Sequence, residues 1–145
     1  MRTMLKYLLA AFYAYAGYRH IVDPAPFMMI TPGWVPAPGK VIMWTGLAEI
    51  AGAIALIQPV SHRLRQCGGI GLALYALCVW PANINHMLID MAQAGGGWGL
   101  SYHIPRLIVQ PIIIWLALWV GDVIDWPFEF RRKARKATPG DELRS

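Results

Sequence analysis

A glutamate, Glu49, lies near the middle of an apolar run that covers residues 41–60. A run of about 20 residues can cross the hydrocarbon core of a bilayer as a helix. A carboxylate at that depth is costly unless it is paired, hydrated or protonated, and ionisable residues inside membranes are commonly functional. A carboxyl group held there can exchange a proton with a bound molecule. The chemistry of this chain therefore depends on what Glu49 faces.

Other polar side chains occur on the other apolar runs, at spacings that place them on one face of a helix. Residues three or four apart share a helix face, and such pairs occur in all four runs. The candidate ligand-binding residues are His20, Glu49, Asn83, His86, Arg106 and Gln110. Because buried charges in proteins are usually paired, we expect Arg106 or His86 to offset the charge of Glu49.

Each candidate also has a purely structural interpretation. Glu49 could pair with Arg106 only to assemble the helices, and the two histidines could be interfacial residues. The two amides could link helices through hydrogen bonds, or satisfy carbonyl groups that nearby prolines leave without a helix partner. Metal binding by His20, Glu49 and His86 is chemically conceivable. No local ligand spacing supports it, so no metal site is predicted.

Four apolar blocks must position these side chains. They cover residues 5–21, 41–60, 67–89 and 107–126, and each is near the ~20 residues that a spanning helix needs. The chain is 57% hydrophobic and 14% charged, whereas a soluble domain usually carries about 25% charged residues. The sequence predicts an all-α integral membrane four-helix bundle over residues 1–130, with no sizeable soluble domain, and a basic cytoplasmic tail over residues 131–145.

The distribution of basic residues predicts the orientation of this bundle. Ten of the 13 Lys and Arg residues lie in the N-terminus, the second loop and the tail, and three lie in or beside the first and third loops. The positive-inside rule then places both termini in the cytoplasm, in a bacterial inner membrane. The net charge of +5 reflects this topology and gives no reason to invoke nucleic acid.

The tail combines an aromatic group with a cluster of basic residues. Such a pairing suits the anionic lipid headgroups at a cytoplasmic membrane surface. The alternative is a docking site for a partner protein. The residues predicted to make these contacts are Trp126, Arg131, Arg132, Lys133, Arg135 and Lys136.

The two predicted external segments differ in character. Residues 24–39 contain five prolines beside several large apolar side chains, which predicts a stiff cap folded over the outer mouth of the bundle. Residues 92–103 contain three consecutive glycines, which predicts a permissive and mobile loop. A rigid cap beside a flexible flap suits access to a site, although plain connectors fit equally well.

An ordered set of short motifs over roughly residues 5–120 resembles the DoxX-like family of small bacterial membrane proteins. In chain order the motifs are G-x-x-H with D-P (Gly17, His20, Asp23, Pro24), P-x-W-x-P (Pro32, Trp34, Pro36), G-x-x-E (Gly46, Glu49), P-A-N-x-x-H (Pro81 to His86) and R-x-x-x-Q (Arg106, Gln110). The resemblance implies a four-helix bundle related to the small membrane subunit of thiosulfate:quinone oxidoreductase. It also implies an association with membrane redox chemistry and with sulfur or thiol stress. Ile21 stands where many family members have Phe.

From these residues and the resemblance we expect a polar pocket in the outer leaflet, with a bound quinone as the first candidate ligand. No intrinsic cofactor is predicted, so electrons would come from a redox partner protein. A non-catalytic accessory or assembly subunit of a larger membrane complex is the alternative. A small-solute carrier is a third interpretation, although no inverted repeat is evident. The sequence alone leaves open whether the protein is an enzyme.

Overall fold

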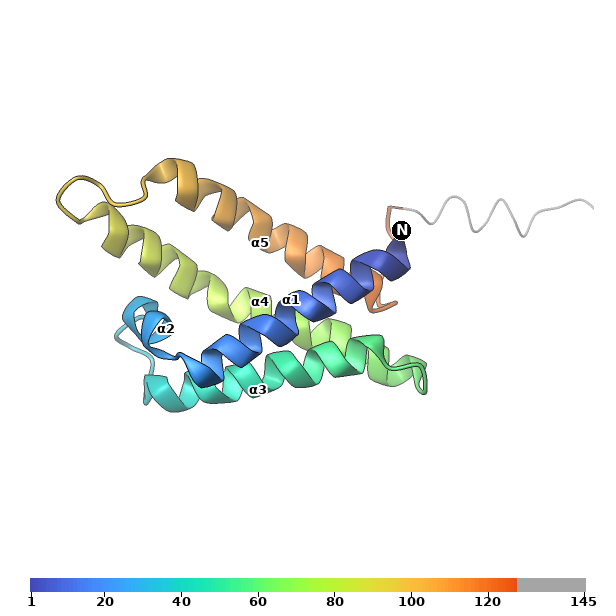
Figure 1. Ribbon diagram of the computed structural model, residues 1–145. Helices are drawn as coiled ribbons and strands as arrows, with labels where there is room; N and C mark the ends of the chain where they lie inside the picture. The colour runs from blue at the N-terminus through green and yellow to red at the C-terminus, as the bar shows by residue number, and fades with distance from the viewer. Residues whose placement is uncertain (128–145) are drawn as a thin grey trace, which may run out of the picture.

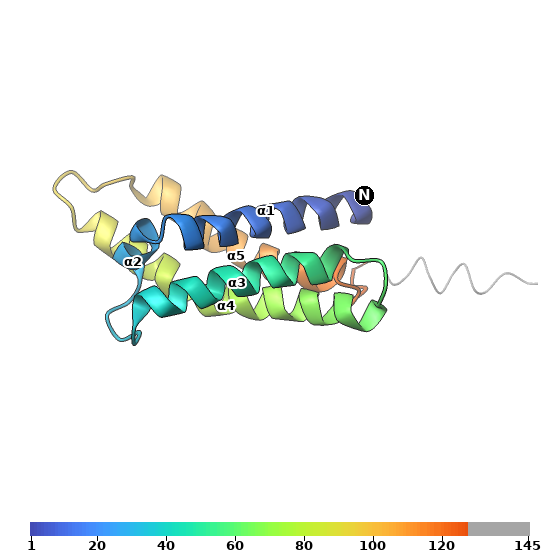
Figure 2. The same ribbon diagram turned by 60° about the horizontal axis from the view of Figure 1, so that its bottom comes forward.

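The computed structural model describes residues 1–127, and the secondary structure within them is entirely helical. Four long helices, α1 (Arg2–Val22), α3 (Pro38–Ile57), α4 (His62–Met91) and α5 (Leu100–Val120), accompany one short helix, α2 (Ala25–Ile30). The long helices run in alternating directions (Figure 1), so the N-terminus and the end of α5 lie at the same end. We call this the terminal end. The opposite end, with α2 and the loop between α4 and α5, is the cap end (Figure 2).

Three of the helices, α3, α4 and α5, are long and apolar enough to cross a membrane. This result confirms the all-helical class predicted from the sequence, and it shows three helices that could span a membrane. The fourth predicted span, α1, does not reach the same apolar character. It is as long as α5, but it contains Lys6, Arg19 and four tyrosines, which lower its mean hydropathy.

The outer surface of the long helices carries many large apolar side chains. Trp44, Ile54, Leu74 and Ile108 are each more than half exposed. Contiguous exposed apolar surface is uncommon on soluble monomers and marks contact with a membrane or another protein. The exposed surface therefore agrees with helices that face lipid.

The helix boundaries differ from the predicted ones at both ends of α4. The internal turn, predicted at residues 61–66, is confined to the few residues before His62. Ser61 caps α4 by accepting a hydrogen bond from the Leu64 amide, as an N-cap serine commonly does. The Gln58 side chain closes the turn, since its amide nitrogen donates to the Ser61 carbonyl at 2.7 Å and its oxygen accepts from the Ser61 amide at 2.8 Å. Helix α4 then continues through Pro81 to Met91.

The packed core lies in the half of the molecule nearer the terminal end. Its buried members come from the first half of α1, the last half of α3, the first half of α4 and the end of α5, and include Leu9, Tyr13, Leu56, Leu72 and Val120. Neighbouring helices pack in chain order, α3 on α4 and α4 on α5, while α1 packs mainly on α3. The half nearer the cap end is less filled, and the polar candidates lie there.

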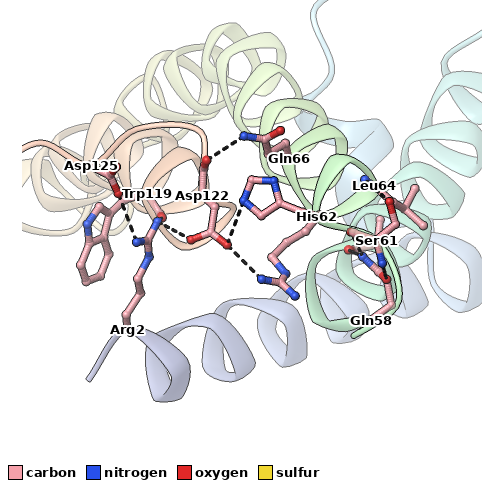
Figure 3. A network of polar contacts seen from close by, with 11 residues as sticks. Arg2, Gln58, Ser61, His62, Leu64, Gln66, Trp119, Asp122 and Asp125 are labelled. Atoms are coloured by element: carbon pink, nitrogen blue, oxygen red, sulfur yellow. Dashed lines mark hydrogen bonds and ion pairs between the residues drawn. The ribbon is translucent and has the colours of Figure 1, made fainter.

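A network of charged side chains closes the terminal end (Figure 3). Asp122, just after α5, forms ion pairs with Arg2 of α1 at 2.7 Å and with Arg65 of α4 at 2.9 Å. The Gln66 side chain donates to the Asp122 carbonyl at 2.9 Å. The Arg2 guanidinium also lies 5.2 Å from the centre of the Trp119 ring and donates to the Trp119 carbonyl. Asp122 thus ties three helices together.

We predict that Asp122→Asn lowers the free energy of unfolding by about 1–2 kcal/mol, because the Arg65 guanidinium loses its counterion and Arg2 keeps only Asp125, at 3.4 Å. Asparagine tolerates the positive φ of 63° at this position, so the backbone conformation is retained. Thermal unfolding in detergent micelles, followed by circular dichroism, measures the change.

The matched control is Asp23→Asn, which removes the same charge from one exposed ion pair with Arg19 at the cap end. We expect this control to change stability by less than about 0.5 kcal/mol. Equal effects of the two substitutions would contradict a special role for the Asp122 network.

Candidate functional site

A cavity of about 350 Å³ lies in the cap half of the molecule, between the four long helices and the segment that follows α1. Most of its lining is apolar. Five of the six predicted ligand-binding residues line it, namely His20, Glu49, Asn83, Arg106 and Gln110. The sixth, His86, is outside the lining and contacts Arg106. The structure therefore brings together residues from α1, α3, α4 and α5 that are widely separated in the sequence.

One wall of the cavity carries a buried carboxylate–imidazole pair. The Nδ1 atom of His20 lies 3.0 Å from Oε2 of Glu49, and the two residues are 8% and 2% exposed. The Tyr75 ring lies 6.4 Å from the His20 ring and also lines the cavity. The expectation that Arg106 or His86 offsets Glu49 is wrong, because His20, on the helix that packs directly against α3, reaches the carboxylate instead.

Two glycines allow α1 and α3 to approach closely enough for this pair to form. A Cβ atom on Gly17 would lie 2.5 Å from the Gly46 carbonyl oxygen and 3.1 Å from Cβ of Glu49. A Cβ atom on Gly46 would lie 2.8 Å from the Gly17 carbonyl oxygen and 2.8 Å from Cβ of His20. Each glycine thus faces the polar residue of the other helix. Small residues at a helix interface permit such a close approach.

The opposite wall carries a chain of hydrogen bonds that begins at Arg106. The guanidinium contacts Nδ1 of His86 at 2.7 Å and donates to Oδ1 of Asn83 at 2.8 Å. Asn83 donates to the Gln110 side chain at 3.3 Å, and Gln110 donates to the Ala76 carbonyl at 2.5 Å. The amides link α4 to α5, as their structural interpretation anticipates. They also fix Arg106 with its guanidinium at the edge of the cavity.

The proline-rich segment after α1 lines the cavity at the cap end. Phe27 and Ile30 of α2 and the following Trp34 are among the residues that line the cavity. The Phe27 ring packs edge-on against the His20 ring, with centres 4.0 Å apart. The Asn85 side chain donates to the Ile30 carbonyl at 2.9 Å, which fastens the cap to α4. Trp34 is 74% exposed and so stands at the rim.

The sequence analysis missed a second buried acid–histidine pair beside the cavity. Oδ2 of Asp90 lies 2.9 Å from Nε2 of His103, and the two residues are 4% and 1% exposed. The same oxygen accepts a hydrogen bond from the Trp98 amide at 2.7 Å. The His103 ring lies 5.1 Å from the His86 ring, next to Arg106. In the sequence, the signal for this pair is that Asp90 and His103 flank the glycine-rich loop.

This pair changes the interpretation of the loop between α4 and α5. Four of its glycines have positive φ angles, as the sequence predicted for a permissive segment. At its end, however, the loop is fastened, because a Cβ atom on Gly97 would overlap the Asp90 carboxylate. The part of the loop at Gly97 and Trp98 is thus in contact with Asp90, and the mobility of the loop stays a prediction.

The remaining predicted contacts concern the tail. Trp126 is exposed, and its carbonyl accepts a hydrogen bond from the Trp115 side chain at 3.3 Å. The basic residues Arg131, Arg132, Lys133, Arg135 and Lys136 lie outside the described residues, so their predicted lipid or partner contacts stay predictions. Within residues 1–127, no group of three His, Cys, Asp or Glu side chains could hold a metal ion.

Comparison with protein families gives one match. The family described as "Domain of unknown function (DUF8561)" matches residues 9–121, which is more than half of the chain, so the chain belongs to this family. No curated protein and no solved structure matches the chain. The match covers the whole cavity but carries no assigned activity, and the resemblance to the DoxX-like family stays a prediction.

We predict that Gly46→Ala lowers the free energy of unfolding by about 1–3 kcal/mol, because the added methyl group pushes α1 away from α3. Thermal unfolding in detergent micelles measures the loss. The control is Gly71→Ala on α4, where nothing lies within 4 Å of the added Cβ atom. There we expect stability to be unchanged or raised by up to about 1 kcal/mol. If both substitutions behaved alike, the close approach of α1 and α3 would not be a packing constraint.

We predict that Gly97→Ala loosens the end of the loop, because the new methyl group displaces the Asp90 carboxylate from the Trp98 amide. Hydrogen exchange at the Trp98 amide should become at least about tenfold faster. Gly96→Ala is the control, since it shares a positive φ but has open space around the added atom. Equal acceleration in both variants would mean that backbone strain, and not contact with Asp90, governs the loop.

Proposed function

We propose that this member of the DUF8561 family is a membrane protein whose cavity binds a small organic molecule, with a quinone as the first candidate. The observation that carries the proposal is the cavity itself, with hydrogen-bond donors on one wall and a carboxylate–imidazole pair on the other. A quinone has two carbonyl oxygens on opposite sides of a flat apolar ring. Its recognition and reduction require donors to those oxygens and a route for protons.

The shape and lining of the cavity support a ring-sized ligand. Its volume of about 350 Å³ lies in the usual range for small-molecule sites. Apolar side chains such as Ile42, Val79 and Ile113 make up most of the lining and offer contacts to a ring. An apolar tail could leave between the helices into lipid.

The two polar walls support different roles. Arg106, held by Asn83, can donate to one ligand oxygen, and Gln110 lies beside them. His20 and Glu49 lie 3.0 Å apart and can hold or transfer a proton near the other oxygen. The residues of one wall would thus orient the ligand, and those of the other would exchange its proton.

The membrane arrangement that accompanies this function is also a proposal. In it, α1 is a fourth span, both termini are cytoplasmic and the cap end lies in the outer leaflet of a bacterial inner membrane. The predominance of basic residues in the N-terminus, the second loop and the tail of the sequence supports this orientation. Electrons would come from a redox partner protein, because no intrinsic cofactor is predicted.

A second candidate function is that of a non-catalytic accessory subunit. The observation that favours it is the number of polar contacts that only connect helices, such as the bond from Gln110 to the Ala76 carbonyl. In this case the candidate residues would stabilise the helix assembly, and the exposed surface would dock a larger complex. Stoichiometric co-purification with a partner, without any bound small molecule, would distinguish the accessory role.

We predict that a benzoquinone with all four ring positions substituted slows the modification of Cys78 by a maleimide at least about fivefold when it occupies the site at about 80%. Cys78 lines the cavity and is exposed, so a bound ligand should shield its thiol. Full substitution of the ring suppresses addition of the thiol to the quinone. Mass spectrometry of the purified protein in micelles measures the rate.

Cys67 is an internal control, because it is an exposed thiol on the same helix but is not part of the cavity lining. Its rate should not change with added quinone. Glu49→Gln should weaken the protection of Cys78 if the carboxylate contacts the ligand. Unchanged labelling of Cys78 at saturating quinone, or equal slowing at both cysteines, would reject the quinone site.

A further inference from the structure

The charge of Arg106 is not balanced by any described side chain. Among residues 1–127, Arg2, Arg19 and Arg65 each form an ion pair with an aspartate. Arg106, in contrast, bonds to the neutral acceptors His86 and Asn83 and forms no ion pair with a described residue. The Tyr102 ring, 5.3 Å from the guanidinium carbon, adds a cation–π contact but no negative charge.

The one carboxylate that lines the cavity does not provide this balance. Glu49 is paired with His20 on the other wall. The nearby Asp90 is occupied by His103 and the Trp98 amide. Each carboxylate near the cavity thus has its own partners, and the cavity holds an excess of positive charge at Arg106.

An arginine in this setting is an anion-binding group. Its guanidinium has five N–H donors, of which the contacts with His86 and Asn83 occupy two. Arg106 is only partly buried, but it borders a cavity lined mostly by apolar side chains, and hydrogen bonds between a guanidinium and an anion are stronger than those between neutral groups. Guanidinium groups match the planar, two-oxygen geometry of carboxylates and related anions better than ammonium groups do.

We infer that the ligand of this cavity carries one anionic oxygen group beside an apolar body, and that this group binds Arg106. Carboxylates, sulfonates and ionised hydroxyquinones share this chemistry. The inference rests on the proposed function, since it concerns the same cavity, and it narrows the ligand class. The anion would lie on the wall opposite Glu49, because two negative charges at that wall would repel each other.

The wild-type protein provides the first test, which requires no substitution. The probes are a 2-hydroxy-3-alkyl-1,4-naphthoquinone, which is ionised at neutral pH, and its 2-methoxy ether, which is neutral and has nearly the same shape. Protection of Cys78 from a maleimide, with Cys67 as the internal reference, gives the affinity of each. We expect the ionised compound to bind about tenfold or more tightly than the ether, because a charge-assisted hydrogen bond is added.

Substitution of Arg106 provides the second test. Arg106→Gln should reduce the preference for the ionised compound to within about threefold, and Arg106→Lys should retain part of it. The control is Arg19→Gln, which removes the same charge at the cap end from a residue that is paired with Asp23 and does not line the cavity. This control should leave the preference unchanged, and thermal unfolding identifies any variant that fails to fold.

The outcomes separate the two proposals, if a phenylalkanoate of matched length is included as an anion without a quinone ring. Equal binding of the two naphthoquinones would overturn the anion inference and leave the quinone site intact. Binding of the phenylalkanoate alone, dependent on Arg106, would support the anion inference and reject a quinone site. Binding of no probe would reject both.

Discussion

The contact between the backbones of α1 and α3 is the constraint on which the rest of the site depends. Gly17 and Gly46 each leave no room for a side chain, so the helices approach until backbone atoms meet. At that distance the side chains of His20 and Glu49 can reach each other at 3.0 Å. Without this contact the carboxylate would stand alone in an apolar environment, where an unpaired charge is strongly unfavourable.

The molecule is divided along its length into a filled half and a hollow half. Near the terminal end, interlocking side chains such as Leu56 and Leu72 are almost completely buried, and ion pairs around Asp122 close the structure. Near the cap end, the cavity lies between the helices, and the proline-rich segment after α1 forms part of its lining. Because the helices are packed tightly near the terminal end, the two polar walls of the cavity can face each other without packing together.

The sequence predicted the helices and most cavity residues because both depend on local spacing. Pairs such as Asn83 and His86 share a helix face whatever their tertiary partners are. Their spacing among apolar residues can be recognised from the sequence alone. The partner of Glu49 was not predictable in this way, because it depends on which helix packs against α3. Asp90 and His103 escaped notice because they flank a loop, where no periodic pattern marks which side chains face each other.

The Asp90 carboxylate has a consequence for the neighbouring helix that reaches beyond the loop itself. By holding His103 in the first turn of α5, it fixes the rotation of that helix about its own axis. Arg106 follows three residues later and so shares the face of His103, which directs its guanidinium toward the cavity. The direction in which the Arg106 guanidinium points is therefore set by Asp90, which is not part of the cavity lining. A change in loop length before Gly97 would leave this rotation intact.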